Sequence, residues 1–169
     1  MKVEIGPGET RLDDSWTTLG PYNSDIICRW GYEPLPFENN TVDLIHASHV
    51  LEHIIWHKTI DALKEAHRIL VPSGKIEIHV PNFKVIVDAY LKKKCGDPWR
   101  AHNKEGDYMK WVNGRIFTYG GPGNNHRAIF DENYLKKCLL SAGFREVLLE
   151  APVRGHNHGP INLAITGVK

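Results

Sequence analysis

The sequence has few cysteines, no long apolar run and almost no net charge. Its three cysteines among 169 residues lie far apart without a CxxC pair, which argues against a disulfide framework or a zinc knuckle and fits a reducing cytosol. No apolar run approaches the ~18 residues of a membrane span. Glycine follows after the first five residues, which are too few to form the apolar core of a signal peptide. Twenty-one basic and 20 acidic residues give a net charge of +1, which is too small to attract nucleic acid or an anionic membrane by overall charge. We therefore expect a cytoplasmic protein that binds neither.

The chain has the length and composition of one globular domain spanning residues 1–169. Hydrophobic residues make up 41% and charged residues 24% of it, so a buried core is expected. Apolar periodicity predicts strands that alternate with helices. The last two strands are expected to form an antiparallel hairpin added to a parallel sheet. The predicted strands are 2–5, 16–19, 26–28, 41–46, 75–80, 144–150 and 161–166, and the predicted helices lie within 48–70, 83–91 and 132–142.

Two helix boundaries are expected to follow local signals. The helical pattern from 48 to 70 breaks near residue 58, which predicts two helices with Thr59 as the N-cap of the second and Pro72-Ser73-Gly74 as the stop. Asp131 is expected to cap the last helix, which Gly143 closes. Strands that alternate with helices indicate an α/β fold.

Residues 96–128 are rich in glycine and aromatic residues and are expected to form a loop-rich insert or lid. Aromatic faces stack on sugar and ring substrates, so the side chains of this insert are candidates to line an acceptor pocket. The alternative is that half of them pack the insert onto the sheet. The residues concerned are Tyr108, Trp111, Phe117 and Tyr119.

The first predicted strand ends in a glycine turn, Gly6-Pro7-Gly8, where backbone can approach a ligand closely. Two further stretches, EPLPFENNTVDLIHASHVLEHI at 33–54 and LKEAHRILVPSGK at 63–75, accompany it. Together with HRAIFDENYLKKCLLSAGF after the insert, they resemble the class I S-adenosylmethionine-dependent methyltransferases. The resemblance covers about residues 2–150 and is close to a short subset associated with sugars and polysaccharides.

The resemblance implies a Rossmann-like methyltransferase fold: a mostly parallel seven-stranded sheet with an antiparallel C-terminal strand and helices on both faces. It also implies S-adenosyl-L-methionine as cofactor. Arg68 matches a structural position that should not touch the chemistry. The positions that match the family's cofactor-binding motifs are Glu4, Gly6, Pro7, Gly8, Leu35, Pro36, Phe37, Ala47, Ser48 and His49.

Two departures from the family pattern concern the acidic residues that hold ribose and adenine. The acidic position after the second strand falls on Gly20, and the stretch after the third strand reads Cys28-Arg29-Trp30-Gly31. Trp30 is a candidate to offer adenine a stacking face. The carboxylates that could replace the missing acid from neighbouring loops are Asp13, Asp14 and Asp25.

Three histidines are candidate catalytic residues, because a hydroxyl acceptor needs a proton acceptor. His49 and His53 lie where the resemblance places the methyl-bearing sulfur, and His126, near the end of the insert, could come down over the acceptor side. Each could instead be a structural hydrogen-bonding residue. The spacing of His49, His53 and His57 could also offer a zinc pair, but the HExxH pattern is absent and we expect no metal site.

The sequence thus favours a methyltransferase that acts on a small-molecule acceptor, with a saccharide hydroxyl preferred. The alternative is a methyltransferase-like binding or assembly subunit that no longer catalyses, which the missing acids support. A nicotinamide-dependent oxidoreductase is disfavoured because the third glycine of a dinucleotide fingerprint is missing. A homodimer that covers one flank of the cofactor cleft is a further hypothesis.

Overall fold

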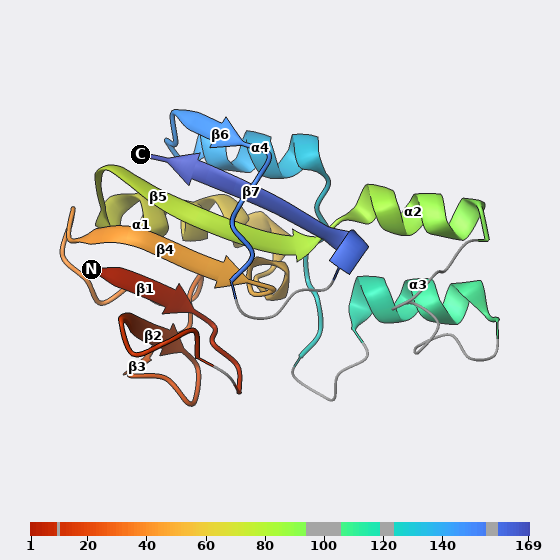
Figure 1. The fold of residues 1–169 in the computed structure, drawn as a ribbon, viewed down its shortest axis with the longest axis horizontal. Helices are drawn as coiled ribbons and strands as arrows, with labels where there is room; N and C mark the ends of the chain where they lie inside the picture. Colours follow the sequence, from red (N-terminus) through yellow and green to blue (C-terminus); the bar gives the residue numbers. More distant parts are fainter. Residues whose placement is uncertain (10, 94–105, 119–123, 155–158) are drawn as a thin grey trace.

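The computed structural model describes residues 1–9, 11–93, 106–118, 124–154 and 159–169. Seven strands form one sheet in the order β3-β2-β1-β4-β5-β7-β6 (Figure 1). Every neighbouring pair is parallel except those made by β7, which runs antiparallel to both β5 and β6. The predicted mostly parallel sheet with an antiparallel C-terminal strand is therefore confirmed. The strands are β1 (Lys2–Ile5), β2 (Trp16–Gly20), β3 (Ile26–Ile27), β4 (Val42–Ser48), β5 (Leu70–Pro81), β6 (Glu146–Leu148) and β7 (Asn162–Val168).

The strand order reverses direction at β1, which has β2 on one side and β4 on the other. In register, Ile5 at the end of β1 lies between Leu19 of β2 and Ala47 of β4. Such a switch point opens a crevice beyond the carboxyl ends of the strands, where α/β sheets bind ligands. The glycine turn after β1 and the residues after β4 therefore face the same edge of the sheet.

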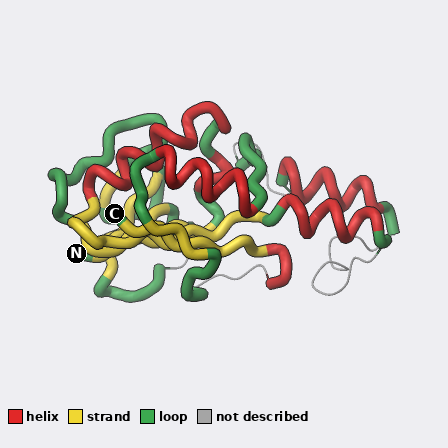
Figure 2. The backbone as a smooth tube through the Cα atoms, turned by 90° about the horizontal axis from the view of Figure 1, so that it is seen from above, coloured by secondary structure: helices red, strands yellow, loops and turns green. Residues whose placement is uncertain are grey.

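The hydrophobic core lies between one face of the sheet and two helices, α1 (Thr59–Ile69) and α4 (Glu132–Ser141). Alternate residues of the central strands point to this face, and Val3, Ile45 and Ile76 are fully buried in one cluster with Leu63 of α1 and Leu135 of α4. Seen along the sheet, both helices lie on the same side of it (Figure 2).

The fold class is confirmed, but one detail differs from the expectation of helices on both faces. Within the described ranges no α-helix lies against the second face of the sheet. That face is crossed instead by residues 149–154, which follow β6 (Figure 1). The crossing is fixed by hydrogen bonds from Thr166 Oγ1 to the Glu150 carbonyl (2.6 Å) and between His79 Nε2 and the Pro152 carbonyl (3.1 Å). This segment therefore supplies partners to Thr166 and His79, whereas His79 Nδ1 and His46 Nε2 are buried without a partner among the described residues.

The stretch after β4 is not the helix that the sequence predicts. It forms two short 3-10 turns, η1 (Leu51–His53) and η2 (Trp56–Lys58), before α1 begins at Thr59. Lys58 holds the N-cap position, Thr59 is the first helical residue, and the Thr59 hydroxyl has no hydrogen-bond partner among the described residues, so its predicted N-cap role is wrong. The next strand already begins at Leu70 and runs through the expected stop. By contrast, Asp131 caps α4 as predicted, accepting a hydrogen bond from the Tyr134 amide (2.7 Å).

Part of the expected loop-rich insert is helical. Helix α2 (Phe83–Leu91) has the predicted bounds, and α3 (Tyr108–Phe117) packs beside it, away from the core helices (Figures 1 and 2). Trp111 of α3 is fully buried in a small second cluster with Ile86 of α2. The Trp111 side chain therefore packs α3 against α2. Phe117 is 58% exposed, and Tyr119 lies outside the described residues.

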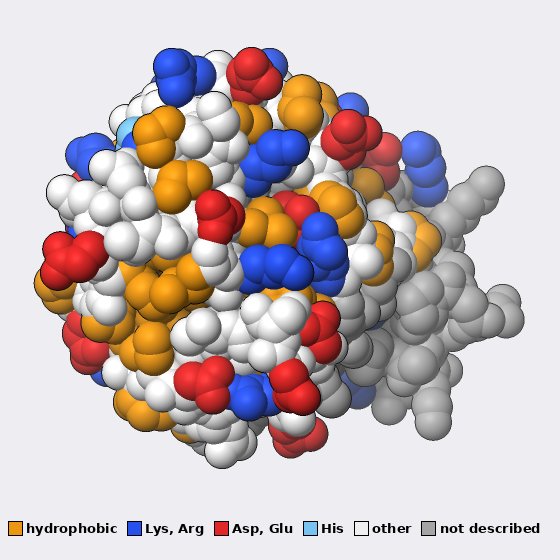
Figure 3. Space-filling model, turned by 60° about the vertical axis from the view of Figure 1, so that its left-hand side comes forward, with side chains coloured by type: hydrophobic (Ala, Val, Ile, Leu, Met, Phe, Trp, Pro, Cys, Tyr) orange, Lys and Arg blue, Asp and Glu red, His pale blue; other side chains and the backbone are white. Residues whose placement is uncertain are grey.

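Acidic and basic side chains are interspersed on the face of the molecule that Figure 3 shows, without a continuous area of one sign. The described helices include none that is long and apolar enough to cross a membrane.

Candidate active site

The turn after β1 combines a tight backbone contact with open space. Gly6 has φ +70°, and a Cβ on it would overlap Val50 Cγ2, so only glycine lets the turn lie against the residue after β4. The Gly6 amide donates to the Leu19 carbonyl (2.7 Å), which ties the turn to β2. Gly8 has φ +65°, but a Cβ there would meet nothing within 4 Å. The backbone at Gly8 is thus accessible to a ligand.

Two side chains beside this turn differ in role. Glu4 is 6% exposed and accepts a hydrogen bond from the Leu12 amide (3.1 Å), while burial raises the pKa of its carboxyl. It therefore braces the segment that returns from the glycine turn. Ser48, at the end of β4, has a buried hydroxyl without a hydrogen-bond partner among the described residues. Ala47 is fully buried in the core, so it can offer a ligand only its backbone.

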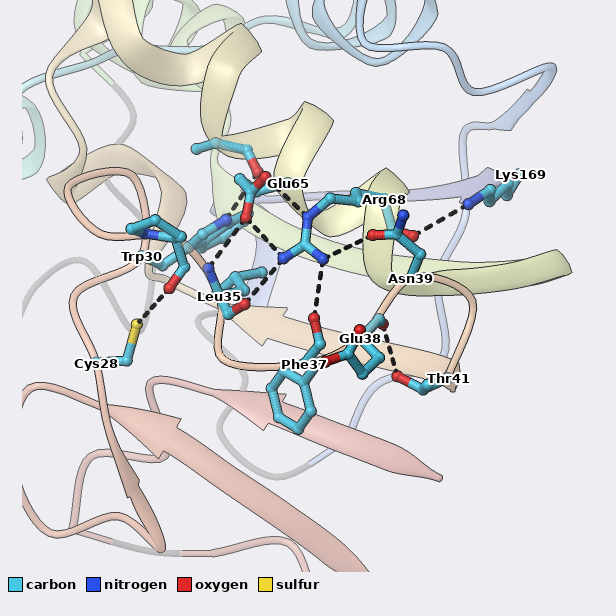
Figure 4. Close-up of polar contacts among 12 residues, drawn as sticks. Cys28, Trp30, Leu35, Phe37, Glu38, Asn39, Thr41, Glu65, Arg68 and Lys169 are labelled. Atoms are coloured by element: carbon cyan, nitrogen blue, oxygen red, sulfur yellow. Dashed lines mark hydrogen bonds and ion pairs between the residues drawn. The ribbon is translucent and has the colours of Figure 1, made fainter.

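The Leu35–Phe37 loop is held from α1 (Figure 4). Arg68 donates from Nη2 to the Leu35 carbonyl (2.9 Å) and from Nη1 to the Phe37 carbonyl (2.8 Å). Glu65 accepts from the Leu35 amide (3.0 Å) and pairs with Arg68 (2.9 Å). The hydrogen bond from Arg68 lowers the pKa of the Glu65 carboxyl. Arg68 is therefore a positioning residue for the predicted adenine-side loop.

Near the two positions where this chain lacks the family's ribose- and adenine-binding acids, the proposed substitutes are held by other contacts. Trp30 is 4% exposed and its indole donates to the Ala62 carbonyl (2.8 Å), which makes it a core residue and disfavours the predicted stacking role. Asp25 is engaged by Arg11 and by the Thr18 amide, and these bonds lower its pKa to about 2. A side chain on Gly20 would project onto the Ser24 hydroxyl, 2.8 Å from the ideal Cβ. Ser24 therefore lies where a side chain at position 20 would point, and its hydroxyl donates to the Tyr22 carbonyl (3.0 Å).

His49 is fixed by contacts on both ring nitrogens. It follows β4 with φ +55°, and its amide donates to the His79 carbonyl (2.8 Å). Nδ1 lies 3.1 Å from Glu52 Oε1, and Nε2 lies 2.8 Å from Asn162 Oδ1 at the start of β7. Both neighbouring atoms are acceptor oxygens, so the two contacts fix the orientation of the ring, and the carboxylate on Nδ1 is the partner that orients a histidine for proton transfer through its other nitrogen.

Glu52 is 1% exposed. Its burial opposes ionisation, but the hydrogen bond with His49 and the neighbouring histidines outweigh this and lower the pKa of Glu52. The Glu52 carbonyl also accepts hydrogen bonds from the amides of Arg127 (2.7 Å) and Ala128 (3.1 Å). These bonds bring the segment after α3 onto η1.

That segment carries the third candidate histidine. The rings of His126 and His53 meet edge to face with centroids 4.9 Å apart, and burial lowers the pKa of His126. His126 thus lies beside His53, while its predicted place on the acceptor side stays a prediction. Sequence reasoning named His49 but no partner for its ring. It missed Glu52 and Asn162 as partners of His49. Asn162 is 113 residues away in sequence, so no local pattern could identify it.

Comparison with known proteins agrees with this architecture. Residues 13–149 match the family model described as a methyltransferase domain. The ubiquinone/menaquinone biosynthesis C-methyltransferase UbiE of Blochmanniella pennsylvanica is 31% identical over 145 residues, covering 83% of this chain and 51% of that protein. A demethylmenaquinone methyltransferase of Staphylococcus epidermidis is 24% identical over 123 residues, which cover 69% of this chain and 46% of that protein. The chain spans about half the length of the curated relatives it matches.

Solved structures are similar in fold. A methyltransferase of Thermotoga maritima, described as a possible histamine N-methyltransferase, has a TM-score of 0.60 at 20% identity and covers 99% of this chain and 81% of that one. The methyltransferase CalH, solved with S-adenosylhomocysteine, has a TM-score of 0.54 at 17% identity, and the match covers 99% of this chain and 50% of CalH. This chain belongs to the class I S-adenosylmethionine-dependent methyltransferases, and S-adenosyl-L-methionine is the cofactor of that family.

Proposed function

We propose that this domain holds S-adenosyl-L-methionine across the carboxyl ends of β1 and β4 and transfers its methyl group to a small cyclic acceptor. The observation that carries the proposal is the glycine turn at the switch point, with its backbone open at Gly8. The Ser48 hydroxyl lies at the end of β4, at the same edge of the sheet, and is buried without a hydrogen-bond partner among the described residues. Arg68 in addition fixes the Leu35–Phe37 loop, which leads into β4. These groups fit a nucleoside with a charged, methyl-bearing end.

The bound cofactor supplies a methyl group on positively charged sulfur, and the protein supplies alignment and proton transfer. His49 receives the acceptor's proton on Nε2 once the acceptor hydroxyl replaces Asn162 Oδ1 beside that nitrogen, while Glu52 keeps the ring oriented through Nδ1. The Gly6–Gly8 turn and Ser48 would hold this cofactor, whose sulfur would keep the electron pair of the carbon–sulfur bond when the methyl carbon bonds to the acceptor atom. Ser24 takes the place of the ribose-binding acid, and its hydroxyl is the nearest polar group beyond Gly20.

For the acceptor we propose an aromatic ring that carries hydroxyl groups, of the quinol type. The support is the relative at 31% identity, whose name describes a quinone C-methyltransferase. Removal of a phenolic proton makes the ring carbon nucleophilic, so the same histidine serves; after methylation the ring carbon loses its hydrogen as a proton and the oxygen regains one, which restores the aromatic hydroxyl ring. A saccharide hydroxyl is the second candidate, supported by the sequence resemblance, and it needs the same proton acceptor.

Calorimetry with S-adenosylmethionine and S-adenosylhomocysteine tests cofactor binding. Gly8→Arg should abolish the binding heat, because the added side chain fills the open space beside the turn; circular dichroism checks that the fold tolerates the strain of a side chain at φ +65°. Gly106→Arg is the matched control: Gly106 also has a positive φ, +71°, and free space, but lies at the start of α3. Equal affinity in both variants would place the cofactor elsewhere. Absent binding in the wild type would favour the non-catalytic subunit.

Methyl transfer is then measured by mass spectrometry with a demethylated quinol and with free sugars as acceptors. His49→Ala should slow turnover at unchanged cofactor affinity, while His57→Ala, an exposed histidine on the following turn, should leave the rate unchanged. An unaffected rate in His49→Ala removes this residue from the mechanism. Transfer to sugars alone would favour the second candidate acceptor.

A further inference from the structure

Three side chains of metal-ligand type converge beside the proposed methyl-transfer site. Glu52 and His53 lie on η1, and His126 comes from the segment after α3. One ligand atom from each lies within 4.8 Å of the others. Donor atoms on one tetrahedral zinc ion stand roughly 3.3 Å apart, given bonds of about 2.0–2.1 Å. Small rotations of these side chains would therefore close the set around one ion.

The remaining polar atoms of these residues are engaged in the way that metal ligands are. His53 Nδ1 lies 3.3 Å from the Asn125 carbonyl oxygen, and His126 is hydrogen-bonded to the backbone of Arg115. A histidine that donates one ring N–H to a carbonyl presents the lone pair of its other nitrogen to a metal. Glu52 Oε1 is similarly occupied by His49. Each residue therefore has a second contact that fixes its orientation.

One polar atom of the cluster lacks a partner. Glu52 Oε2 is buried and has no hydrogen-bond partner among the described residues. An unsatisfied buried carboxylate oxygen is costly, because it has lost its hydration without replacement. A cation beside Oε2 would supply the missing interaction. His53 and His126 are only half-buried, so an ion between them could also hold water or an acceptor oxygen.

We propose that Glu52, His53 and His126 bind one divalent first-row transition-metal ion, with zinc as the reference ion. Two imidazole nitrogens and one carboxylate oxygen form the donor set of open zinc sites and of ferrous facial triads. The site goes beyond methyl transfer, because the cofactor-binding groups contribute none of its ligands. An alternative in which the three residues form only a hydrogen-bonded cluster makes the opposite prediction for metal uptake.

Untagged, chelator-treated protein is dialysed against limiting Zn²⁺ and, separately, Co²⁺, without cofactor. We expect one ion per chain by elemental analysis and a visible Co²⁺ absorption band. Glu52→Gln and His126→Ala should each weaken uptake at least ~100-fold, more than outer-sphere changes do, whereas His57→Ala should bind as the wild type does. Circular dichroism confirms that each variant is folded, and the isosteric Glu52→Gln variant tests the site with little risk of unfolding.

Absence of stoichiometric uptake by the wild type would overturn the proposal, as would equal uptake by the folded Glu52→Gln variant. Since uptake is measured without S-adenosylmethionine, a negative result leaves the cofactor calorimetry unaffected. Conversely, a protein that takes up zinc but gives no heat with the cofactor would retain this site and lose the proposed function.

Discussion

An acid-dependent loss of stability should originate at Glu77, on the second face of the sheet. In register, Thr18, Glu4, His46, Glu77 and Thr166 form one polar row across five strands. Glu77 is 4% exposed, and Arg154 donates to both of its oxygens, at 2.6 and 3.0 Å. His46 Nδ1 lies 3.3 Å from the same carboxylate.

The size of the effect follows from the pKa of this carboxyl. Burial alone would raise the pKa of Glu77, but the hydrogen bonds from His46 and Arg154 lower it from 4.5 to about 2. A depression of that size corresponds to about 3 kcal/mol of stability above the unfolded pKa. Because the folded pKa is the lower one, this stability is present above pH 4.5 and is lost as the pH falls toward 2. About 1 kcal/mol should be gone at pH 4 and about 2 kcal/mol at pH 3.

The assay is urea unfolding of wild type and Glu77→Gln between about pH 6 and pH 3, where the difference in unfolding free energy should shrink as the pH falls. Asp61→Asn is the control: Asp61 forms an exposed ion pair with Lys64 at 3.2 Å, and such pairs contribute about 0–1 kcal/mol. Its difference from wild type should stay small at every pH. Parallel curves for wild type and Glu77→Gln would refute the reasoning.

Three further changes test the site and its supports. Gly6→Ala should lower the unfolding free energy by about 2 kcal/mol or more, from left-handed strain plus overlap with Val50. A Val50→Ala background should reduce this loss, and an equal loss in both backgrounds contradicts the packing. Arg68→Lys should lower the unfolding free energy by about 1.5–3 kcal/mol, because the Leu35–Phe37 loop loses the two hydrogen bonds from Arg68. It should also weaken S-adenosylmethionine binding in calorimetry, and unchanged affinity would show that this loop does not support the cofactor. Asp131→Ala should cost about 1 kcal/mol in urea unfolding through loss of the α4 cap, and no change would show that the cap contributes nothing.

Local patterns were sufficient where one periodicity or one turn signal dominates. The strict alternation at 75–80 lies within β5, the bounds of α2 agree with the apolar pattern, and Asp131 caps α4. The stretch at 48–58 was predicted wrongly, because its apolar spacing suits a helix. Its backbone instead bonds to a distant segment, as in the hydrogen bonds of the Glu52 carbonyl with the amides of Arg127 and Ala128.

The sequence by itself determined the alternation of strands and helices, the glycine turn after the first strand and the histidines to consider, because these depend on neighbours a few residues apart. Only the tertiary structure decided what those histidines contact. Asn162 meets His49, and His126 meets His53, after the chain has returned to the same sheet edge. The polar row that holds Glu77 likewise arises from strand register, which pairs residues from five separate segments.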